Sequence, residues 1–170
     1  MKFKRKTGKI TGINATKAWK MVRDGISYVE IAAEIGYQTS RVKQFANKKY
    51  KTEADRLWAD IVKAPGRCAI KGCSRQSLQA HHLIEKSTHP HLRFELLNGI
   101  CLCAYHHMYD PTISGHSGCV AALNLIEYIQ SYNPEQYEWV MHHKSDKAYQ
   151  EVYYNEEYNK LKGLATRGIK

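Results

Sequence analysis

Between residues 13 and 64, apolar side chains recur at helical spacing and glycines interrupt the pattern. Asn14 can cap a first helix that runs to about Arg23, and Gly25 is the stop residue that follows it. Ser27 can cap a second helix, SYVEIAAEI, whose apolar positions also follow helical spacing. The pattern therefore predicts two short helices at the start of this region.

Two more helices are expected in the same region. Thr39 or Ser40 begins a third helix, SRVKQFANK, which has apolar residues on one face. Thr52 and Asp55 have the spacing of a capping box, and this predicts the start of a separate fourth helix that continues through Val62.

After Pro65 and Gly66, which break the helical pattern, the sequence changes to short runs. Two strands are expected, SLQAHHLI and NGICLC, with a polar segment around residues 87–95 between them. The last part of the chain predicts a helix that ends at Gly163 and two helices before it. The three helices are expected at about 119–131, 134–142 and 146–162. These elements place the chain in the α+β class.

The positive charge of the chain is confined to its N-terminal part. Residues 1–67 carry 16 Lys and Arg against 6 Asp and Glu, whereas residues 68–170 carry 10 of each. A basic segment joined to a neutral one favours a polyanion-binding module attached to a second domain. The alternative is a basic surface that only keeps the protein in solution.

The third predicted helix is the candidate DNA-reading element. Two short helices joined by a turn at Gly36, with a small residue at Ala32 or Ala33 where they cross, form a helix-turn-helix pattern. A plain helical bundle is the alternative. In the first case double-stranded DNA is the partner, and the arm, residues 1–12, can follow its backbone. The predicted DNA-binding residues are Lys4, Arg5 and Lys6 in the arm, and Gln38, Thr39, Ser40, Arg41, Lys43, Gln44 and Asn47 in the helix.

All five cysteines fall between Cys68 and Cys119. The N-terminus is basic, no apolar run follows it as in a secretory leader, and no stretch is apolar enough for a membrane span. We therefore expect no membrane association and a cytoplasmic, reducing setting. There, clustered cysteines are more typical of metal ligands than of disulfides.

Two pairs of metal-binding residues lie about thirty residues apart. They are Cys68-x4-Cys73 and Cys103-x2-His106, and four such ligands in two pairs suit a tetrahedral structural Zn²⁺. Cys101 competes with Cys103, because alternation puts both on the same side of a strand. Cys103 is preferred since only it has the two-residue spacing to His106.

A second set of histidines can hold a different cation. His81 and His82 are adjacent on a strand and therefore point to opposite faces, so His81 can bind a cation while His82 faces a water. His107 follows the proposed zinc ligand and can point away from it, and His116 can close the site from the next loop. Neutral imidazoles with open water positions suit a catalytic divalent ion.

These residues resemble the HNH endonucleases of the ββα-metal fold. The resemblance runs through Cys68–Cys73, LQAHHLI, NGICLC and the following HH, more loosely to His116, and covers about fifty residues strongly. It is closest to phage-encoded members, and the N-terminal 65 residues are an added module as in homing-type relatives. The residue pattern and the resemblance together predict three domains, namely a basic flexible arm (1–12), a helix-turn-helix domain (13–64) and a zinc-stabilised HNH nuclease domain with a C-terminal helical extension (65–170).

The resemblance also implies roles for individual residues. His82 would be the general base that deprotonates the attacking water, and Asn98 would hold the connecting loop and so orient His82. His81 and His107 would bind the catalytic cation, either Mg²⁺ or Mn²⁺, with Ni²⁺ or Zn²⁺ as alternatives. His116 would be the third ligand of this cation or a transition-state stabiliser. Cleavage would leave 5′-phosphate and 3′-hydroxyl ends.

The chain departs from the common family pattern in two places. His106 replaces the last cysteine of the usual second C-x2-C pair. His116 lies further from its partner than usual, so Asp110, three residues after His107, is a rival third ligand.

The sequence as a whole predicts a metal-dependent DNA endonuclease that a helix-turn-helix domain brings to its target. The resemblance implies that it is encoded by a phage in a bacterial host. Two other functions fit parts of the pattern. One is a zinc-stabilised DNA-binding regulator without catalysis, which leaves the histidine pattern unexplained. The other is an RNA or structure-specific nuclease that uses the same site.

Overall fold

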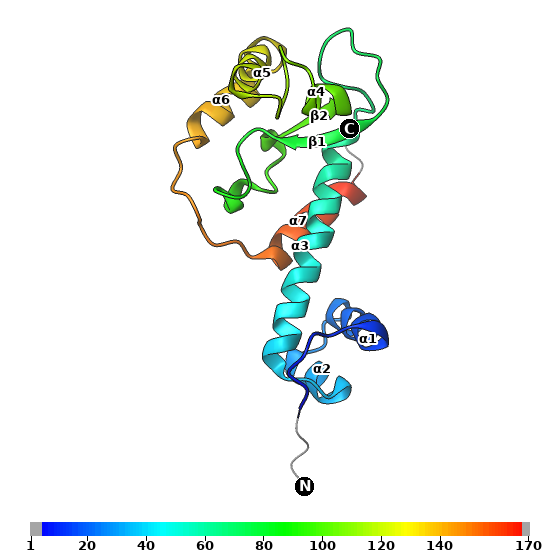
Figure 1. The fold of residues 1–170 in the computed structure, drawn as a ribbon. Helices are drawn as coiled ribbons and strands as arrows, with labels where there is room; N and C mark the ends of the chain where they lie inside the picture. The colour runs from blue at the N-terminus through cyan, green and yellow to red at the C-terminus, as the bar shows by residue number, and fades with distance from the viewer. Residues whose placement is uncertain (1–4, 168–170) are drawn as a thin grey trace. The chain divides into compact units, whose positions relative to one another are not determined.

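The chain forms two compact units, of which a computed structural model describes residues 5–167. The first unit extends to Glu53 and the second begins at Ala54 (Figure 1). The division falls inside helix α3 (Thr39–Lys63). The sequence predicted a domain boundary after residue 64, because Pro65 and Gly66 break the helical pattern there. In the structure, the boundary between the two compact units falls earlier, after Glu53.

In the first unit, α1 (Gly12–Arg23) and α2 (Tyr28–Ile35) precede α3. The predicted cap of α2 is confirmed, since the side chain of Ser27 accepts from the backbone of Glu30 and the Glu30 side chain accepts in return. Gly36 ends α2 with a φ of 73°, a left-handed conformation that favours glycine. The turn between the second and third helices is therefore set by local sequence.

The core of the first unit forms where these helices meet. Ala32 is fully buried there, whereas Ala33 is exposed, so Ala32 is the small residue at the helix contact. The third helix contributes Val42 and Ala46, both at 0 % exposure. The other buried members are Ile10, Ala18, Val22, Ile31, Ile35 and Tyr37.

The described part of the predicted flexible arm, from Arg5 onward, is attached to the first unit. Lys6 forms a parallel bridge with Tyr37: its backbone N–H donates to Gly36 O at 2.9 Å, and its carbonyl accepts from Gln38 N at 3.1 Å. Ile10 is only 6 % exposed. The prediction of a free arm is wrong for these residues, because backbone pairing and apolar burial hold them.

The predicted break before Thr52 is also wrong, since α3 is a single helix of 25 residues. The Thr52 hydroxyl donates to the carbonyl of Lys48 at 2.9 Å, so it bonds within the helix instead of capping a new one. No glycine or proline lies between Ser40 and Lys63 to interrupt the backbone ladder.

The second unit contains a two-stranded antiparallel sheet. Strand β1 (Leu78–His82) pairs with β2 (Gly99–Cys103), and a short helix, α4 (Ala104–Met108), follows β2 directly (Figure 1). In the observed register His81 is opposite Ile100 and His82 is opposite Gly99. Both predicted strands are present, and the α+β class is confirmed.

The connection between the two strands is more ordered than its polar sequence indicates. It contains two short 3-10 helices, η1 (Pro90–Leu92) and η2 (Leu96–Asn98). Between them Phe94 is 2 % exposed and packs with Trp58 and Cys101 in one core cluster. The connection is thus fixed from within and can position side chains that lie next to it.

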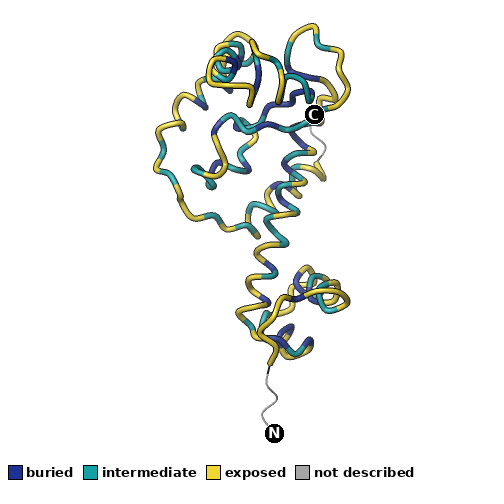
Figure 2. Tube along the Cα trace, viewed as in Figure 1, coloured by how far each residue is buried: buried dark blue, intermediate teal, exposed yellow. Residues whose placement is uncertain are grey.

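Helix α3 lies close to the start of β2. A side chain at Gly99 would place its Cβ 2.8 Å from the Trp58 ring and closer still to Val62. Gln136 secures the same point, because its side-chain amide donates to Gly99 O at 2.8 Å and to Leu97 O at 3.0 Å. Strand β2 is buried beyond its first residue (Figure 2).

Three helices complete the unit: α5 (Cys119–Tyr132), α6 (Pro134–His143) and α7 (Tyr154–Thr166). The first two agree with the sequence prediction. The third begins eight residues later than expected and continues through Gly163. In the described part of the chain, no helix combines the length and apolarity needed to cross a membrane.

The late start of α7 has a side-chain cause. Asp146 accepts from His143 at 2.9 Å and lies 3.4 Å from His91, so its carboxylate is engaged with residues that precede it and does not cap a new helix. Tyr149 follows with a φ of 58°. These local contacts hold the segment before α7 in a non-helical conformation.

Candidate metal centres and histidine pocket

The structure brings Cys68, Cys73, Cys103 and His106 together, with their ligand atoms within 4.8 Å of one another. His106 Nδ1 lies 3.4 Å from Cys68 Sγ and 3.3 Å from Cys103 Sγ, and Cys73 Sγ lies 3.7 Å from Cys103 Sγ. Three thiols and one imidazole are a donor set that suits tetrahedral Zn²⁺. This cluster can therefore hold a metal ion such as zinc.

Two backbone turns shape this cluster. Gly72, with a φ of 79°, lets the C-x4-C loop close, and Cys103 begins the turn into α4, where its Sγ accepts from His106 N at 3.5 Å. Cys101, the competing cysteine, instead packs in the core cluster around Trp58. The two-residue spacing to His106 thus identified the correct cysteine of the pair.

Burial raises the pKa of the Cys68 thiol to about 11. Burial also raises the pKa of Cys103, but hydrogen bonds from the His106 backbone and the neighbouring thiols outweigh it, and the pKa is lowered overall. A thiol such as Cys68 stays protonated at neutral pH unless a cation displaces its proton. Metal binding at this cluster would therefore release protons.

Asp110 lies on the outer side of His106, and the prediction that it rivals His116 is wrong. Its Oδ2 is 3.4 Å from His106 Nε2, the ring nitrogen opposite the thiols. Its Oδ1 accepts from the backbone of Thr112 at 2.8 Å and of Ile113 at 3.1 Å. A carboxylate behind a ligand histidine fixes the ring and its tautomer. Asp110 therefore supports the cysteine cluster.

His81, His107 and His116 form a second cluster, in which the candidate ligand atoms again lie within 4.8 Å of one another. The ring centroids are 5.1 Å apart for His81 and His107, 4.8 Å for His81 and His116, and 4.9 Å for His107 and His116. All three are the residues that the sequence predicted for the catalytic cation. Three converging imidazoles can bind a transition-metal or other divalent ion.

The rings of His81 and His107 are held by their surroundings, and His116 is held through its backbone. His81 is 7 % exposed, and Gly115 lies against its ring so closely that a Cβ there would be 2.5 Å from Cε1. His107 Nδ1 is bonded to the Gln79 side-chain oxygen, which leaves Nε2 for a ligand. The backbone N–H of His116 donates to the fully buried Ser114 hydroxyl at 3.2 Å.

Burial lowers the pKa of His81 to about 3, and the neighbouring imidazoles of His107 and His116 lower it further in the same direction. Burial likewise lowers the pKa of His107. These rings are therefore neutral at physiological pH and present free lone pairs, which is the protonation state that a metal ligand requires.

His82 points to the other face of β1, as its position next to His81 predicted. Its ring stacks on Trp58 with a centroid distance of 3.8 Å and an angle of 10°, and its Nε2 lies 2.8 Å from Arg93 O. A carbonyl can only accept, so Nε2 carries the proton and Nδ1 is left as the acceptor. Burial lowers the pKa of His82 to about 4, so the ring is neutral at pH 7.

Asn98 is fully buried and holds the connection between the strands. Its Oδ1 accepts from Ile84 N at 2.7 Å, and its Nδ2 donates to Ile84 O at 3.1 Å and to Leu92 O at 2.9 Å. Leu92 precedes Arg93, whose carbonyl accepts from His82. The Arg93 guanidinium is itself paired with Asp55 at 2.6 and 2.8 Å.

Although His81 and His82 lie on opposite faces of the strand, both line one pocket of about 150 Å³. His116 and Glu85 also line it, and Ile126 adds an apolar wall. A water molecule occupies roughly 30 Å³ in the liquid, so the pocket has room for an ion and several waters or phosphate oxygens. His82 thus shares this pocket with two members of the histidine cluster, His81 and His116.

The predicted DNA-binding residues lie on the surface of the first unit. Gln38 precedes α3, and six others lie in its first nine residues; all are exposed except Thr39, which is half-buried. Arg5 and Lys6 are exposed as well, and the Lys6 ammonium sits 5.6 Å from the centre of the Tyr37 ring. Lys4 falls outside the described residues.

No family model matches the chain, and searches of curated proteins and of solved structures give no significant match. The function is therefore inferred from the geometry of the site itself.

Sequence reasoning missed three residues that shape the histidine pocket. Gln79 could have been found, because it lies two residues before His81 and alternation puts both on one face of the strand. Trp58 and Gly115 come from α3 and from the loop before α5, and nothing in the local sequence links either residue to the histidines.

Proposed function

We propose that the second unit is a metal-dependent nuclease that hydrolyses phosphodiester bonds of DNA. One observation carries the proposal: the imidazoles of His81, His107 and His116 converge beside a pocket that His82 also lines. Because Nε2 of His82 is bonded to Arg93 O, its Nδ1 is left as the acceptor. A cluster that only stabilised the fold would not need this fourth histidine beside it.

The residues divide the chemistry between them. His82 takes a proton from a water at Nδ1, and its pKa of about 4 keeps that nitrogen unprotonated at neutral pH. His81, His107 and His116 would hold the divalent ion, Mg²⁺ or Mn²⁺. When bound, the ion would offset charge on the phosphate and the leaving 3′ oxygen. The products are 5′-phosphate and 3′-hydroxyl ends.

Two residues position the base. The Arg93 carbonyl fixes the tautomer and orientation of His82, and Asn98 fixes the backbone just before that carbonyl. The order β1–β2–α4, with His81 and His82 on the first strand and His107 on the helix, supports an HNH-type ββα-metal arrangement. The cysteine cluster would hold a structural Zn²⁺ beside it.

The first unit would bring the nuclease to double-stranded DNA. Its α1 and α2 and the exposed start of α3 support a helix-turn-helix domain, with α3 in the major groove. Residues 1–53 carry thirteen Lys and Arg against four Asp and Glu, which favours contact with phosphates.

The proposal is tested by incubating the purified chain with supercoiled plasmid and Mn²⁺ or Mg²⁺, beside EDTA and two variants. We expect nicked or linear product that requires the cation and is lost in His82→Ala. His142→Ala is the matched control, because it changes an exposed histidine of the other His-His pair and should cleave normally.

If the wild type binds DNA but cuts neither DNA nor RNA with any divalent cation, the zinc-stabilised regulator replaces the nuclease. Cleavage of RNA alone would keep the site and change its substrate. Equal cleavage by His82→Ala, in folded protein, would assign the base to another residue.

A further inference from the structure

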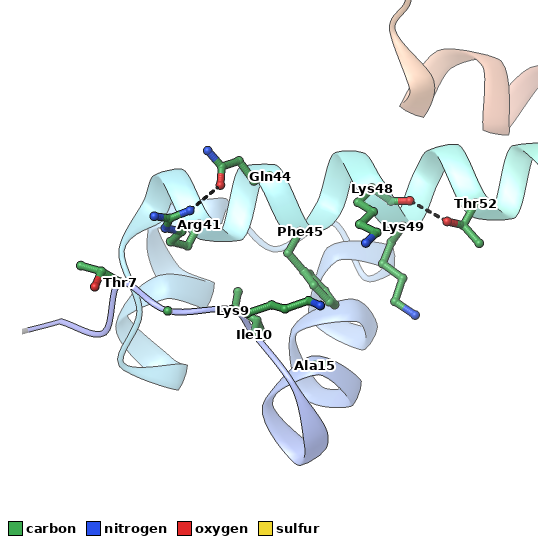
Figure 3. Close-up of a pocket in the computed structure, with 11 residues that line it drawn as sticks. Thr7, Lys9, Ile10, Ala15, Arg41, Gln44, Phe45, Lys48, Lys49 and Thr52 are labelled. Atoms are coloured by element: carbon green, nitrogen blue, oxygen red, sulfur yellow. Dashed lines mark hydrogen bonds between the residues drawn. The ribbon is translucent and has the colours of Figure 1, made fainter. Parts of the chain in front are cut away.

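The first unit contains a pocket of about 610 Å³ that lies beside the proposed DNA-reading surface (Figure 3). The segment Thr7–Ile10 forms one wall and α3 forms the other, with Ala15 of α1 at the base. This volume is within the roughly 300–1,000 Å³ of ordinary small-ligand sites. All its lining residues belong to this unit.

The rim of the pocket is strongly basic. Lys9, Arg41, Lys48 and Lys49 line it, and no aspartate or glutamate does. Arg41 donates to Gln44 at 3.0 Å, but no ion pair is recorded for any of the four cations among residues 5–167. Uncompensated positive charge on several sides of one pocket favours an anionic ligand with more than one charge.

The floor of the pocket is apolar. Ile10 and Ala15 are packed there, and the half-buried Phe45 ring extends from α3 into the space between α3 and α1, with the Lys9 side chain beside it (Figure 3). A ligand that touched only the rim would leave this aromatic surface in water. The occupant therefore has an anionic part and a flat apolar part.

We propose that this pocket binds an unpaired nucleotide of single-stranded nucleic acid. Its base would lie against Phe45, and the phosphates on either side would lie among Lys9, Arg41, Lys48 and Lys49. Duplex DNA presents phosphates on its outside but keeps its base faces stacked within, so it cannot fill the apolar floor. Stacking on an aromatic ring inside a basic groove is the general mode by which proteins hold single strands.

The pocket shares Arg41 and Gln44 with the surface proposed to read the duplex, but the two surfaces also have residues of their own. Lys43 and Asn47 are exposed on α3 but do not line the pocket, whereas Phe45 and Lys48 do. The inference does not depend on the nuclease, because no histidine contributes to it. With both sites, the chain would bind DNA next to an unpaired segment or a strand end.

The test is fluorescence anisotropy with a labelled oligothymidylate and, separately, a labelled duplex of equal length. The full chain carries His82→Ala so that neither probe is cut. Phe45→Leu, which keeps the floor apolar, should weaken single-strand binding about tenfold. Lys48→Gln should weaken it and reduce its salt dependence by about one counterion. Lys43→Gln is the matched control on the same helix.

We expect Lys43→Gln to leave oligothymidylate affinity within about twofold of the parent while it weakens the duplex. The proposal is overturned if Phe45→Leu and Lys48→Gln leave single-strand affinity unchanged. It is also overturned if these two variants weaken only binding to the duplex, because the pocket would then contact the phosphate backbone of duplex DNA instead of an unpaired base. Melting temperatures of the variants show whether a loss comes from unfolding, and Lys48→Gln, at an exposed position, gives a result even if Phe45→Leu does not fold.

Discussion

At the scale of single residues, the histidine pocket depends on side chains that are fixed by buried hydrogen bonds. Asn98 shows this best, because one amide satisfies the N–H and carbonyl of Ile84 and the carbonyl of Leu92. Polar groups that are buried without partners cost about 1–3 kcal/mol each. The loop that orients His82 is therefore ordered by a residue that does not face the pocket itself.

Replacing Asn98 tests this arrangement. We expect Asn98→Ala to lower the free energy of unfolding by about 2–4 kcal/mol, since three backbone groups lose their partner. Urea denaturation measures the loss. Asn155→Ala, on the exposed surface of α7, should stay within about 0.5 kcal/mol of the wild type. Equal effects of the two substitutions would contradict the role given to Asn98.

Gly115 is a second single-residue test. A Cβ at this position would lie 2.5–2.8 Å from three atoms of the His81 ring, so Gly115→Ala must displace either the ring or the loop. We expect the affinity of the histidine cluster for Mn²⁺ to fall by about tenfold or more, as for other losses of ligand support.

The affinity can be measured by titrating Mn²⁺ and following the free ion by electron paramagnetic resonance, which does not require cleavage. Gly163→Ala is the matched control, because apart from its chain neighbours and the backbone of its own helix no atom lies within 4 Å of its Cβ position. That variant should keep the wild-type affinity and gain up to about 1 kcal/mol of helix stability. An unchanged affinity in Gly115→Ala would mean that these histidines bind no Mn²⁺ together.

At the scale of secondary-structure elements, alternation along β1 separates the two kinds of histidine. Gln79 and His81 point to one face and contact the second cluster, whereas Ala80 and His82 point to the face that packs near Trp58. This division could be predicted from the HH dipeptide alone. His81 and His82 nevertheless line the same pocket, because the loops around Gly115 and Glu85 form its other walls. The alternation along the strand does not predict these loops.

Cys73 tests the C-x4-C loop, which supplies two of the four residues of the cysteine cluster. We expect Cys73→Ala to retain less than one equivalent of zinc and to lower the melting temperature by about 10 °C or more, because a small sheet gains much of its stability from the metal. Cys119→Ala removes an exposed cysteine outside the cluster and should change neither quantity. Full zinc content in Cys73→Ala would remove this residue from the site.

At the scale of the whole molecule, buried neutral histidines make stability depend on pH. Burial lowers the pKa of His82 to about 4, whereas in the unfolded chain its pKa is about 6.5. The unfolded state therefore binds a proton that the folded state does not bind between these values. The contribution of His82 to the free energy of unfolding is therefore fully present above about pH 6.5 and is lost as the pH falls towards 4. His81 contributes in the same direction.

The contribution of His82 is measured with His82→Phe, which keeps an aromatic ring against Trp58. Between pH 7 and pH 5, the wild type should lose about 1–2 kcal/mol more unfolding free energy than this variant. Loss of metal at acid pH affects both proteins and cancels in the comparison. An identical pH dependence would mean that His82 titrates normally in the folded protein.

The two units differ in how far their sequences specify them. Ser27 and Glu30 fix the start of α2, and Gly36 fixes the turn between α2 and α3. These are short-range interactions, so the helices on both sides of the turn could be predicted. The continuity of α3 was not predictable, because Thr52 and Asp55 have cap spacing but bond elsewhere. Lys6 and Ile10 are held by pairing and burial that their polar neighbourhood does not reveal.

The spacing of cysteines and histidines along the chain was enough to identify the residues of both clusters. Ligands that are close in sequence can meet only across a turn or on one face of a strand, and each of these has its own spacing. The spacing named Cys103 over Cys101, and it grouped His81 with His107 and His116. Only the tertiary structure decided that Asp110 supports His106, that Trp58 stacks on His82, and that Phe45 faces a basic pocket. Each of these contacts joins segments that are distant in sequence or connected by a loop. Whether two such segments meet depends on how the whole domain packs, which the local sequence pattern does not specify.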